Sequence, residues 1–152
     1  MNKMRCLITI LGISVAFVMG MHLVSHGNAV AAEAKIVKIQ PVEEGMGGKL
    51  IGLYIDPQTL HIEKNTIVIW MNGVPQQEVQ VAFEEGKACK DVTANPIGFH
   101  PDLDKETSCY VASYIPYAAT SSLQFPQAGT FKYFVQTKEG KVKAKGEIIV
   151  RE

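Results

Sequence analysis

The chain has 152 residues, which is enough for one domain together with a targeting segment. Its 15 basic and 15 acidic residues balance, and they form neither a basic stripe nor a polycationic tail. This charge pattern argues against nucleic-acid binding, because such proteins concentrate positive charge on one surface.

The first 32 residues have the order of a secretory signal. Lys3 and Arg5 precede an apolar run over residues 6–21, and small residues follow at positions 29–32. A positive start, a hydrophobic middle and a small-residue cleavage site are typical of export signals. We therefore predict a signal peptide over residues 1–32 and one domain over residues 33–152.

Cleavage is expected after Ala31 or Ala32. The protein would then be periplasmic or extracellular, with no stable membrane insertion. Because Lys3 and Arg5 leave with the signal, 13 basic residues remain against 15 acidic ones, a net charge of about −2. An uncleaved membrane anchor is the alternative, since the apolar run is near the lower limit for a span.

Two cysteines remain after the signal is removed. Cys89 and Cys109 form an even pair in an exported chain, which predicts a disulfide bond. The bond would close a loop of about 20 residues, worth roughly 3 kcal/mol in the chain-entropy model. Two free thiols, or a metal site that uses both thiolates, are the alternatives.

The first half of the domain reads as a series of short strands. Strand character is predicted over residues 34–40, 49–55, 60–63, 66–72 and 76–83, where apolar and polar residues alternate. Pro41 should end the first of these. Lys64-Asn65 predicts one turn, and Asn72-Gly73 predicts a stronger reversal because both residues tolerate positive φ.

The pattern then dissolves between Glu84 and about Tyr110, where glycines and prolines recur between the two cysteines. Such a long irregular segment inside a compact domain usually needs a covalent staple or a function. Strand character returns over residues 110–115 and 120–125, and Leu123 and Phe125 share one face of the second.

The last two strands have the clearest alternation. Phe131, Tyr133 and Val135 share one face of residues 129–136, and the segment 141–150 alternates apolar residues with lysines. This period of two is typical of strands with one solvated face. About seven to eight short strands with Gly/Pro turns predict an all-β, antiparallel sandwich or barrel with one long disulfide-stapled loop.

Three motifs resemble those of the cupredoxin family, which includes plastocyanin and azurin. Residues 64–72 (Lys-Asn-Thr-Ile-Val-Ile-Trp-Met-Asn) resemble the family's Gly-Asp-Thr-Val-x-Trp-x-Asn strand. Residues 125–133 resemble its Phe-x-x-x-Gly-x-Tyr-x-Tyr, and residues 146–150 resemble its closing Gly-x-Ile-x-Val. The resemblance spans most of residues 50–150 and implies a Greek-key β-sandwich, with one type 1 copper ion in most members.

The copper ligands that the resemblance implies are missing. A type 1 site needs two imidazoles, one thiolate and a weak axial thioether. The motifs would place these four ligands at Gln77, Val135, Lys138 or Glu139, and Ala144. Because the hairpin over residues 129–146 contains no His, Cys or Met, we predict a divergent member that has lost its blue copper centre and carries no cofactor.

A non-standard metal site is the alternative. Two histidines remain in the mature chain, His61 on the solvent face of a predicted strand and His100 beside Asp102 and Asp104. Their simplest interpretation is a solvated strand residue and a polar loop, because a convincing metal site needs more ligands of matched type. A copper-binding or electron-transfer protein that uses His100, His61 or Met46 stays open.

Catalytic motifs are also missing. The serines at positions 113, 121 and 122 have no Gly-x-Ser-x-Gly context, and no Cys-x-x-Cys-His haem motif occurs. We therefore expect a non-enzymatic protein that binds an unidentified protein partner, such as a component of a periplasmic redox or surface complex.

A group of aromatic residues follows the cysteine-bracketed segment. Tyr110, Tyr114 and Tyr117 flank Ile115. We interpret them as covering the core, because aromatic rings bury a large apolar area. The alternative is an interface, since tyrosines often anchor protein contacts.

Overall fold

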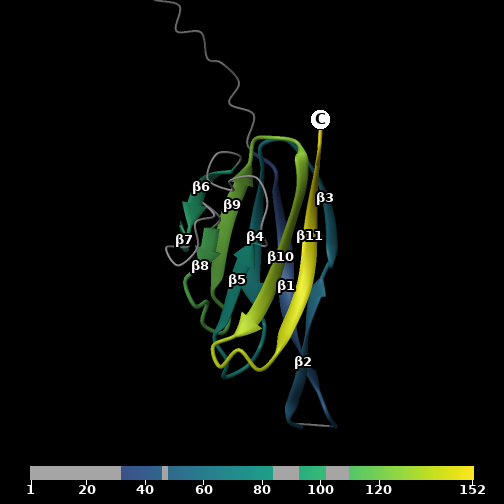
Figure 1. Cartoon of the computed structure of the whole chain (residues 1–152), viewed down its shortest axis with the longest axis vertical. Coiled ribbons are helices and arrows are strands. Elements are labelled where there is room, and N and C mark those ends of the chain that lie inside the picture. The colour runs from purple at the N-terminus through teal and green to yellow at the C-terminus, as the bar shows by residue number, and fades with distance from the viewer. Residues whose placement is uncertain (1–31, 46–47, 84–92, 102–109) are drawn as a thin grey trace, which may run out of the picture. The chain divides into compact units, whose positions relative to one another are not determined.

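The computed structural model describes residues 32–45, 48–83, 93–101 and 110–152. The predicted signal and the predicted Cys89–Cys109 bond lie outside these residues, apart from Ala32. The described strands are β1 (Ala34–Glu43), β2 (Leu50–Asp56), β3 (Thr59–Glu63), β4 (Thr66–Asn72), β5 (Val79–Phe83), β6 (Ala94–Ile97), β7 (Phe99–Pro101), β8 (Tyr110–Ala112), β9 (Thr120–Phe125), β10 (Gly129–Thr137) and β11 (Lys143–Arg151) (Figure 1). Within the described ranges no helix could span a membrane.

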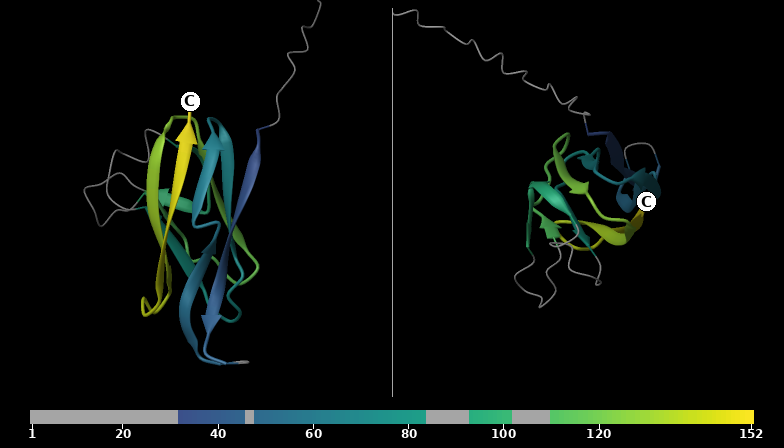
Figure 2. Two further views of the ribbon diagram at one scale, coloured as in Figure 1. Left: turned by 90° about the vertical axis from the view of Figure 1, so that its right-hand side faces the viewer. Right: turned by 90° about the horizontal axis from the view of Figure 1, so that it is seen from above.

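The strands form two sheets packed face to face, so the predicted all-β sandwich is confirmed (Figure 2). One sheet has the order β2-β1-β4-β9-β6, and the other has the order β3-β11-β10-β5-β8-β7. The pairing is not wholly antiparallel, because β1 runs parallel to β4 and β3 runs parallel to β11. The strand count exceeds the predicted one because short strands occur where alternation is weak.

Strand β1 continues past Pro41, where the sequence predicted a break. Its pairing with β4 stops at Ile39, and beyond that point it pairs with β2 alone. Pro41 therefore lies where one edge of the strand has no neighbour in the sheet. Proline is tolerated there because its missing N–H is not needed for a second ladder.

Strands β6 and β7 lie in the segment that the sequence predicted to be irregular. They are short, with four and three residues, and each contains a proline (Pro96 and Pro101). β6 pairs with β9 through a register irregularity, and β7 pairs with β8. Both are edge strands of their sheets, where proline is compatible with strand geometry.

The core is organised around Trp70 on β4. The indole is fully buried, and its ring centroid lies 5.3 Å from that of Phe99, 5.6 Å from Tyr133, 5.9 Å from Phe83 and 6.5 Å from Phe125. Three of these contacts are edge-to-face, an arrangement that the aromatic quadrupole favours. The cluster joins both sheets, because Phe125 lies on β9 and Tyr133 on β10.

The segment from Asp56 to Val81 contains the three predicted strands, β3, β4 and the start of β5. Asn65 has a φ of 68°, as the predicted turn requires. The Asn72-Gly73 reversal is wrong, because neither residue has positive φ and the left-handed residue is Gln76 (φ 58°). Gly73 is instead needed for close approach, since a Cβ there would lie 2.9 Å from the Ile39 carbonyl oxygen.

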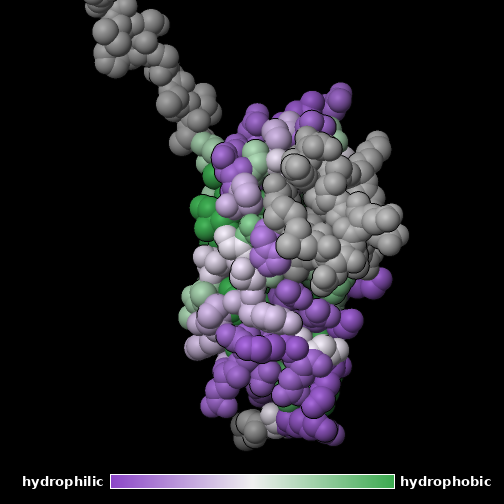
Figure 3. All heavy atoms as spheres, turned by 60° about the vertical axis from the view of Figure 1, so that its left-hand side comes forward, coloured by the Kyte–Doolittle hydropathy of each residue, from purple (hydrophilic) through white to green (hydrophobic). Residues whose placement is uncertain are grey.

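The described part of the face drawn in Figure 3 is largely hydrophilic, and apolar residues gather near the left edge of the view, below the point where the chain enters β1. On the outer face of β1 and β4, Ile36 is exposed and Ile67 and Ile69 are half-buried. Met71 shares that outer face and is half-buried.

Candidate functional site

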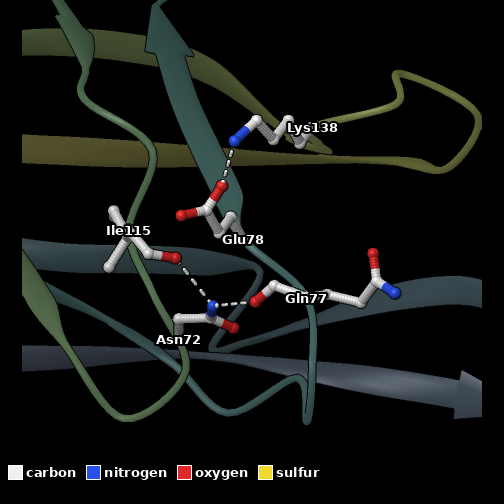
Figure 4. Close-up of polar contacts among 5 residues, drawn as sticks. All are labelled: Asn72, Gln77, Glu78, Ile115 and Lys138. Carbon is white, nitrogen blue, oxygen red and sulfur yellow. Dashed lines mark hydrogen bonds and ion pairs between the residues drawn. The ribbon is translucent and has the colours of Figure 1, made fainter.

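The four positions at which the family resemblance implies copper ligands lie in segments that converge at one end of the sandwich. Val135 on β10 is the cross-strand partner of Ala144 on β11. Gln77 lies two residues before the start of β5, and the backbone N–H of Lys138 donates to the carbonyl of Glu78 at 3.0 Å. We call this region the Asn72 end, defined by Asn72, Gln77, Glu78, Ile115 and Lys138 (Figure 4).

The side chains at these positions do not fit a type 1 copper ion. Val135 is fully buried in the hydrophobic core, and Ala144 packs against that core. Gln77 offers an amide and Lys138 an ammonium group, neither of which replaces an imidazole or a thiolate. Among residues 32–45, 48–83, 93–101 and 110–152, no group of three or more His, Cys, Asp or Glu side chains could hold a metal ion.

Asn72 takes the central place at this end. Its side-chain Nδ2 donates to the carbonyls of Gln77 and Ile115, each at 2.8 Å (Figure 4). Its Oδ1 accepts from the backbone N–H of Val74 at 2.8 Å. One buried amide thus connects the end of β4, the turn before β5 and the segment after β8. Such a hydrogen-bonded network fixes the loops of this end, because each buried carbonyl would otherwise lack a partner.

Glu78 and Lys138 form an ion pair at the surface of the same end. Lys138 Nζ lies 2.6 Å from Glu78 Oε2, and it also lies 5.5 Å from the centre of the Tyr114 ring. The hydrogen bond with Glu78, followed by its negative charge, raises the pKa of Lys138. Because both side chains are exposed, the pair contributes little to stability. Its effect is to hold the lysine beside the aromatic ring.

Two of the tyrosines after the cysteine-bracketed segment are on the surface. Tyr114 is 39% exposed and Tyr117 is 57% exposed, whereas Ile115 between them is only 2% exposed. The interpretation that these tyrosines cover the core is therefore wrong for both. Ile115 anchors the segment because it exchanges backbone hydrogen bonds with Val79 at 3.1 and 2.7 Å. This segment consequently turns Tyr114 and Tyr117 outward.

We call Tyr114, Tyr117, Glu78 and Lys138 the tyrosine surface. Tyr117 lies in the turn that precedes Ala118, whose N–H donates to the Asn72 carbonyl at 2.8 Å. Both tyrosines are therefore attached to the Asn72 network through the backbone. The chemistry available is two phenol rings, one ammonium group and one carboxylate on a fixed scaffold.

The two histidines are far apart. His61 is exposed on β3, with its Nδ1 3.4 Å from Arg151 Nη2, and His100 is exposed on β7. β3 and β7 are the opposite edges of the six-stranded sheet, roughly 24 Å apart at the usual spacing between strands. The two imidazoles therefore cannot share one metal ion. Asp102, Asp104 and Met46 lie outside the described residues.

A shallow hollow of about 280 Å³ lies on the six-stranded sheet, lined by residues that include Thr59, Lys132, Lys145 and Glu147. Thr59 Oγ1 donates to Glu147 Oε1 at 3.1 Å, so the carboxylate is held by the neighbouring strand. The hollow carries mixed charge on a solvated sheet face. Its described lining offers no matched set of metal ligands, and we place the candidate site at the Asn72 end instead.

The positions at which copper ligands were expected lie at the Asn72 end, but the sequence did not indicate that Asn72 is at its centre. Asn72 followed by glycine is a common turn signal, and that local signal concealed a side chain with three buried hydrogen bonds. Two of its partners are 5 and 43 residues away. The only local sign of this structural role is that Asn72, a polar residue, ends a strand on the face that its alternation predicts to be buried.

No protein-family model and no curated protein matches the chain. Among solved structures, a reduced mutant of amicyanin aligns with a TM-score of 0.46 and 18% identity, over 81% of this chain and 87% of that chain. An oxidised amicyanin mutant aligns with a TM-score of 0.45 at the same identity and coverage. A third, reduced Cu(I) form has a TM-score of 0.43. These are likenesses of low sequence identity and low TM-score, and they assign neither a family nor a ligand.

Proposed function

We propose that this chain is an exported, non-catalytic binding protein: a cupredoxin-like sandwich without type 1 copper that holds a protein partner at its tyrosine surface. The observation that carries the proposal is the exposure of Tyr114 and Tyr117 on both sides of the buried Ile115. Tyrosine is enriched at interfaces, because it offers a large contact area at a small cost in conformational entropy.

The scaffold beneath the tyrosine surface supports a binding role. Asn72 hydrogen-bonds the carbonyl of Ile115, and Ile115 pairs with Val79 through the backbone. Little order would therefore have to be gained when a partner docks, which lowers the entropic cost of association. Lys138 beside Tyr114 adds a cation that a carboxylate of a partner protein could meet.

The chemistry of the Asn72 end favours binding over electron transfer. An amide, two apolar side chains and an ion-paired ammonium group stand at the positions where the family resemblance implies copper ligands. Periplasmic or surface localisation follows from the signal-like residues 1–32 and remains part of the proposal.

Partner capture with defined variants tests this function. The full chain is expressed in an exporting host, immobilised, and used to isolate a specific partner from the source compartment. We expect the double variant Tyr114→Ala/Tyr117→Ala to lose that partner while keeping the circular dichroism spectrum of the wild type. Ile36→Ala is the matched control, because Ile36 is a large apolar residue with 53% exposure on another face. Equal capture by the double variant would overturn the proposal.

Metal analysis separates this function from the metal-binding alternative. Protein purified from its native compartment should contain no stoichiometric copper and show no blue absorption band after copper loading. Copper at one equivalent that disappears in His100→Ala would establish a non-standard site and contradict the binding-only role. The same assay on His61→Ala tests the other histidine independently, since the two lie at opposite sheet edges.

A further inference from the structure

The two sheets have four edge strands, and three of them are protected against pairing with another chain. β6 and β7 are short and contain Pro96 and Pro101. β3 carries His61 and Glu63 on its exposed face. Short length, proline and charge are the usual means by which soluble proteins block an open sheet edge.

β2 lacks these protections. It has seven residues, contains no proline, and carries no charge before Asp56 at its end. In the part of the chain that the structure describes, its backbone pairs with β1 alone, so one side of the strand is open. Ile51 and Tyr54 on this strand are 55% and 52% exposed. A long, apolar, uncharged edge is a template for strand addition.

We propose that β2 is the dimer interface of this protein, where the β2 strands of two copies pair antiparallel across a twofold axis at Leu53. The five-stranded sheets of the two copies would then form one continuous sheet. The interface is isologous, since the same strand contributes from both sides.

The residues of β2 are complementary to themselves in this register. Pairing about Leu53 places Tyr54 of one copy opposite Gly52 of the other, twice in the dimer. Gly52 and Tyr54 lie on the outer face, where Gly52 neighbours the half-exposed Val42. The tyrosine ring would cover the open backbone of glycine and reach Val42 beyond it. Ile51 of one copy would lie opposite Ile55 of the other.

The chain already uses the same pairing inside its own sheet. Tyr133 on β10 is the cross-strand partner of Gly146 on β11, and its ring lies against that glycine. A Cβ at position 146 would come within 2.5 Å of the Tyr133 ζ carbon and hydroxyl oxygen. Tyrosine over glycine is therefore an arrangement that this backbone geometry accepts. Cross-strand aromatic contacts are among those that stabilise sheet pairs.

A second copy is favoured over a foreign strand because the complementarity is internal to the sequence Leu-Ile-Gly-Leu-Tyr-Ile-Asp. The glycine and the tyrosine stand at equal distances from Leu53, as a twofold axis requires. To make the same side-chain contacts, a foreign peptide would have to supply both a glycine and a tyrosine at this spacing. The proposal does not depend on the tyrosine surface, whose residues follow β8 or belong to the β5 and β10 ends.

Analytical ultracentrifugation of the full chain, in the processed form that an exporting host releases, tests the dimer. We expect the wild type to pass from monomer to dimer as its concentration rises. Tyr54→Lys should raise the dissociation constant about tenfold or more, because it removes two tyrosine–glycine pairs and places charge on both edges. Ile36→Lys is the control, since its exposure is similar but it lies on the interior strand β1. It should leave the dimer intact.

Hydrogen exchange then locates the interface. Amides of residues 50–56 should gain protection at dimer-forming concentrations, and this gain should vanish in Tyr54→Lys. A protein that is monomeric at every concentration would overturn the proposal. So would a dimer that Ile36→Lys dissolves and Tyr54→Lys does not, or protection confined to β3, because either result would place the contact elsewhere.

Discussion

At the scale of single residues, Tyr133 and Trp70 form an unusual polar contact in the centre of the core. Neither the Tyr133 hydroxyl nor the Trp70 indole N–H makes a hydrogen bond of regular geometry. Burial raises the pKa of Tyr133 to about 12, and the adjacent Trp70 indole offsets this in part. We regard the pair as an incomplete hydrogen bond, which leaves desolvation as the dominant effect on the phenol.

The raised pKa of Tyr133 predicts a loss of stability in alkali. Below pH 10 the phenol keeps its proton in both folded and unfolded chains. Between pH 10 and about 12 the unfolded phenol ionises while the buried one does not, so the free energy of unfolding falls. Over the whole interval the loss is about 3 kcal/mol. Urea unfolding at several pH values measures it.

Tyr133→Phe is the control for the alkaline loss, because it keeps the ring and removes the ionising group. The pKa values of Lys138 and Lys141 are also raised, by hydrogen bonds with Glu78 and Glu139 respectively, so their contributions to stability decline in alkali as well. These contributions are the same in both proteins and cancel in the comparison. An equal alkaline slope in Tyr133→Phe would contradict the assignment.

At the scale of strands, sequence predicted the elements whose two faces differ in polarity. β10 and β11 alternate buried residues with exposed or half-buried ones, so a period of two was visible. β6 and β7 were not predicted, because the Asn-Pro and His-Pro pairs in them are typical of loops, although an edge strand tolerates proline. The parallel pairings of β1 with β4 and of β3 with β11 were not predicted either, because a local sequence pattern does not indicate which strands are neighbours in the sheet.

Part of the candidate site was also predictable from the sequence. Motif spacing located Gln77, Val135 and Ala144, and the structure brings their segments to one end. The outward orientation of Tyr114 and Tyr117 was not predictable, because it depends on Ile115 pairing with Val79, a contact between segments 36 residues apart in sequence. Local alternation cannot decide which member of an aromatic group such a contact buries.

Asn72 should be the polar residue on which the arrangement of these strands most depends. Asn72→Ala removes three hydrogen bonds and leaves the carbonyls of Gln77 and Ile115 without their partner. We expect a loss of about 3 kcal/mol in the free energy of unfolding, measured by urea denaturation.

The control for Asn72→Ala is Gln136→Ala, which removes one half-buried amide contact with Gln80. It should cost about 1 kcal/mol or less. If the two substitutions cost the same, Asn72 would not hold this end of the sandwich together. Partner capture should also weaken in Asn72→Ala, since Ile115 positions both tyrosines.

At the scale of the whole domain, the first and last strands lie inside their sheets. β1 lies between β2 and β4, and β11 lies between β3 and β10. The five-stranded sheet cannot be completed without β1, and the six-stranded sheet cannot be completed without β11. Cooperative folding should therefore require the C-terminal residues.

Deletion of residues 147–152 tests this dependence. It removes the pairing of β11 with β3 and the buried side chains of Ile148 and Val150. Those two side chains alone account for about 3–6 kcal/mol of hydrophobic stabilisation, a large part of the stability of a typical domain. We expect no cooperative thermal transition by circular dichroism.

Deletion of Glu152 alone is the control for the longer truncation. This residue is exposed and lies 3.9 Å from Lys64, a weak surface contact. Its removal should leave the thermal midpoint unchanged. A cooperative transition after the longer deletion would show that β11 is dispensable beyond Gly146.

The directions of β1 and β11 fix how the domain can be tethered. β1 begins beside Ile67 and β11 ends beside Gly129, both at the end of the sandwich opposite Asn72 (Figure 2). A bead, a fusion protein or a membrane attached at the start of β1 or at the end of β11 would thus hold the domain at the end opposite Asn72. The tyrosine surface would point away from the attachment, free to meet a partner that approaches from solution.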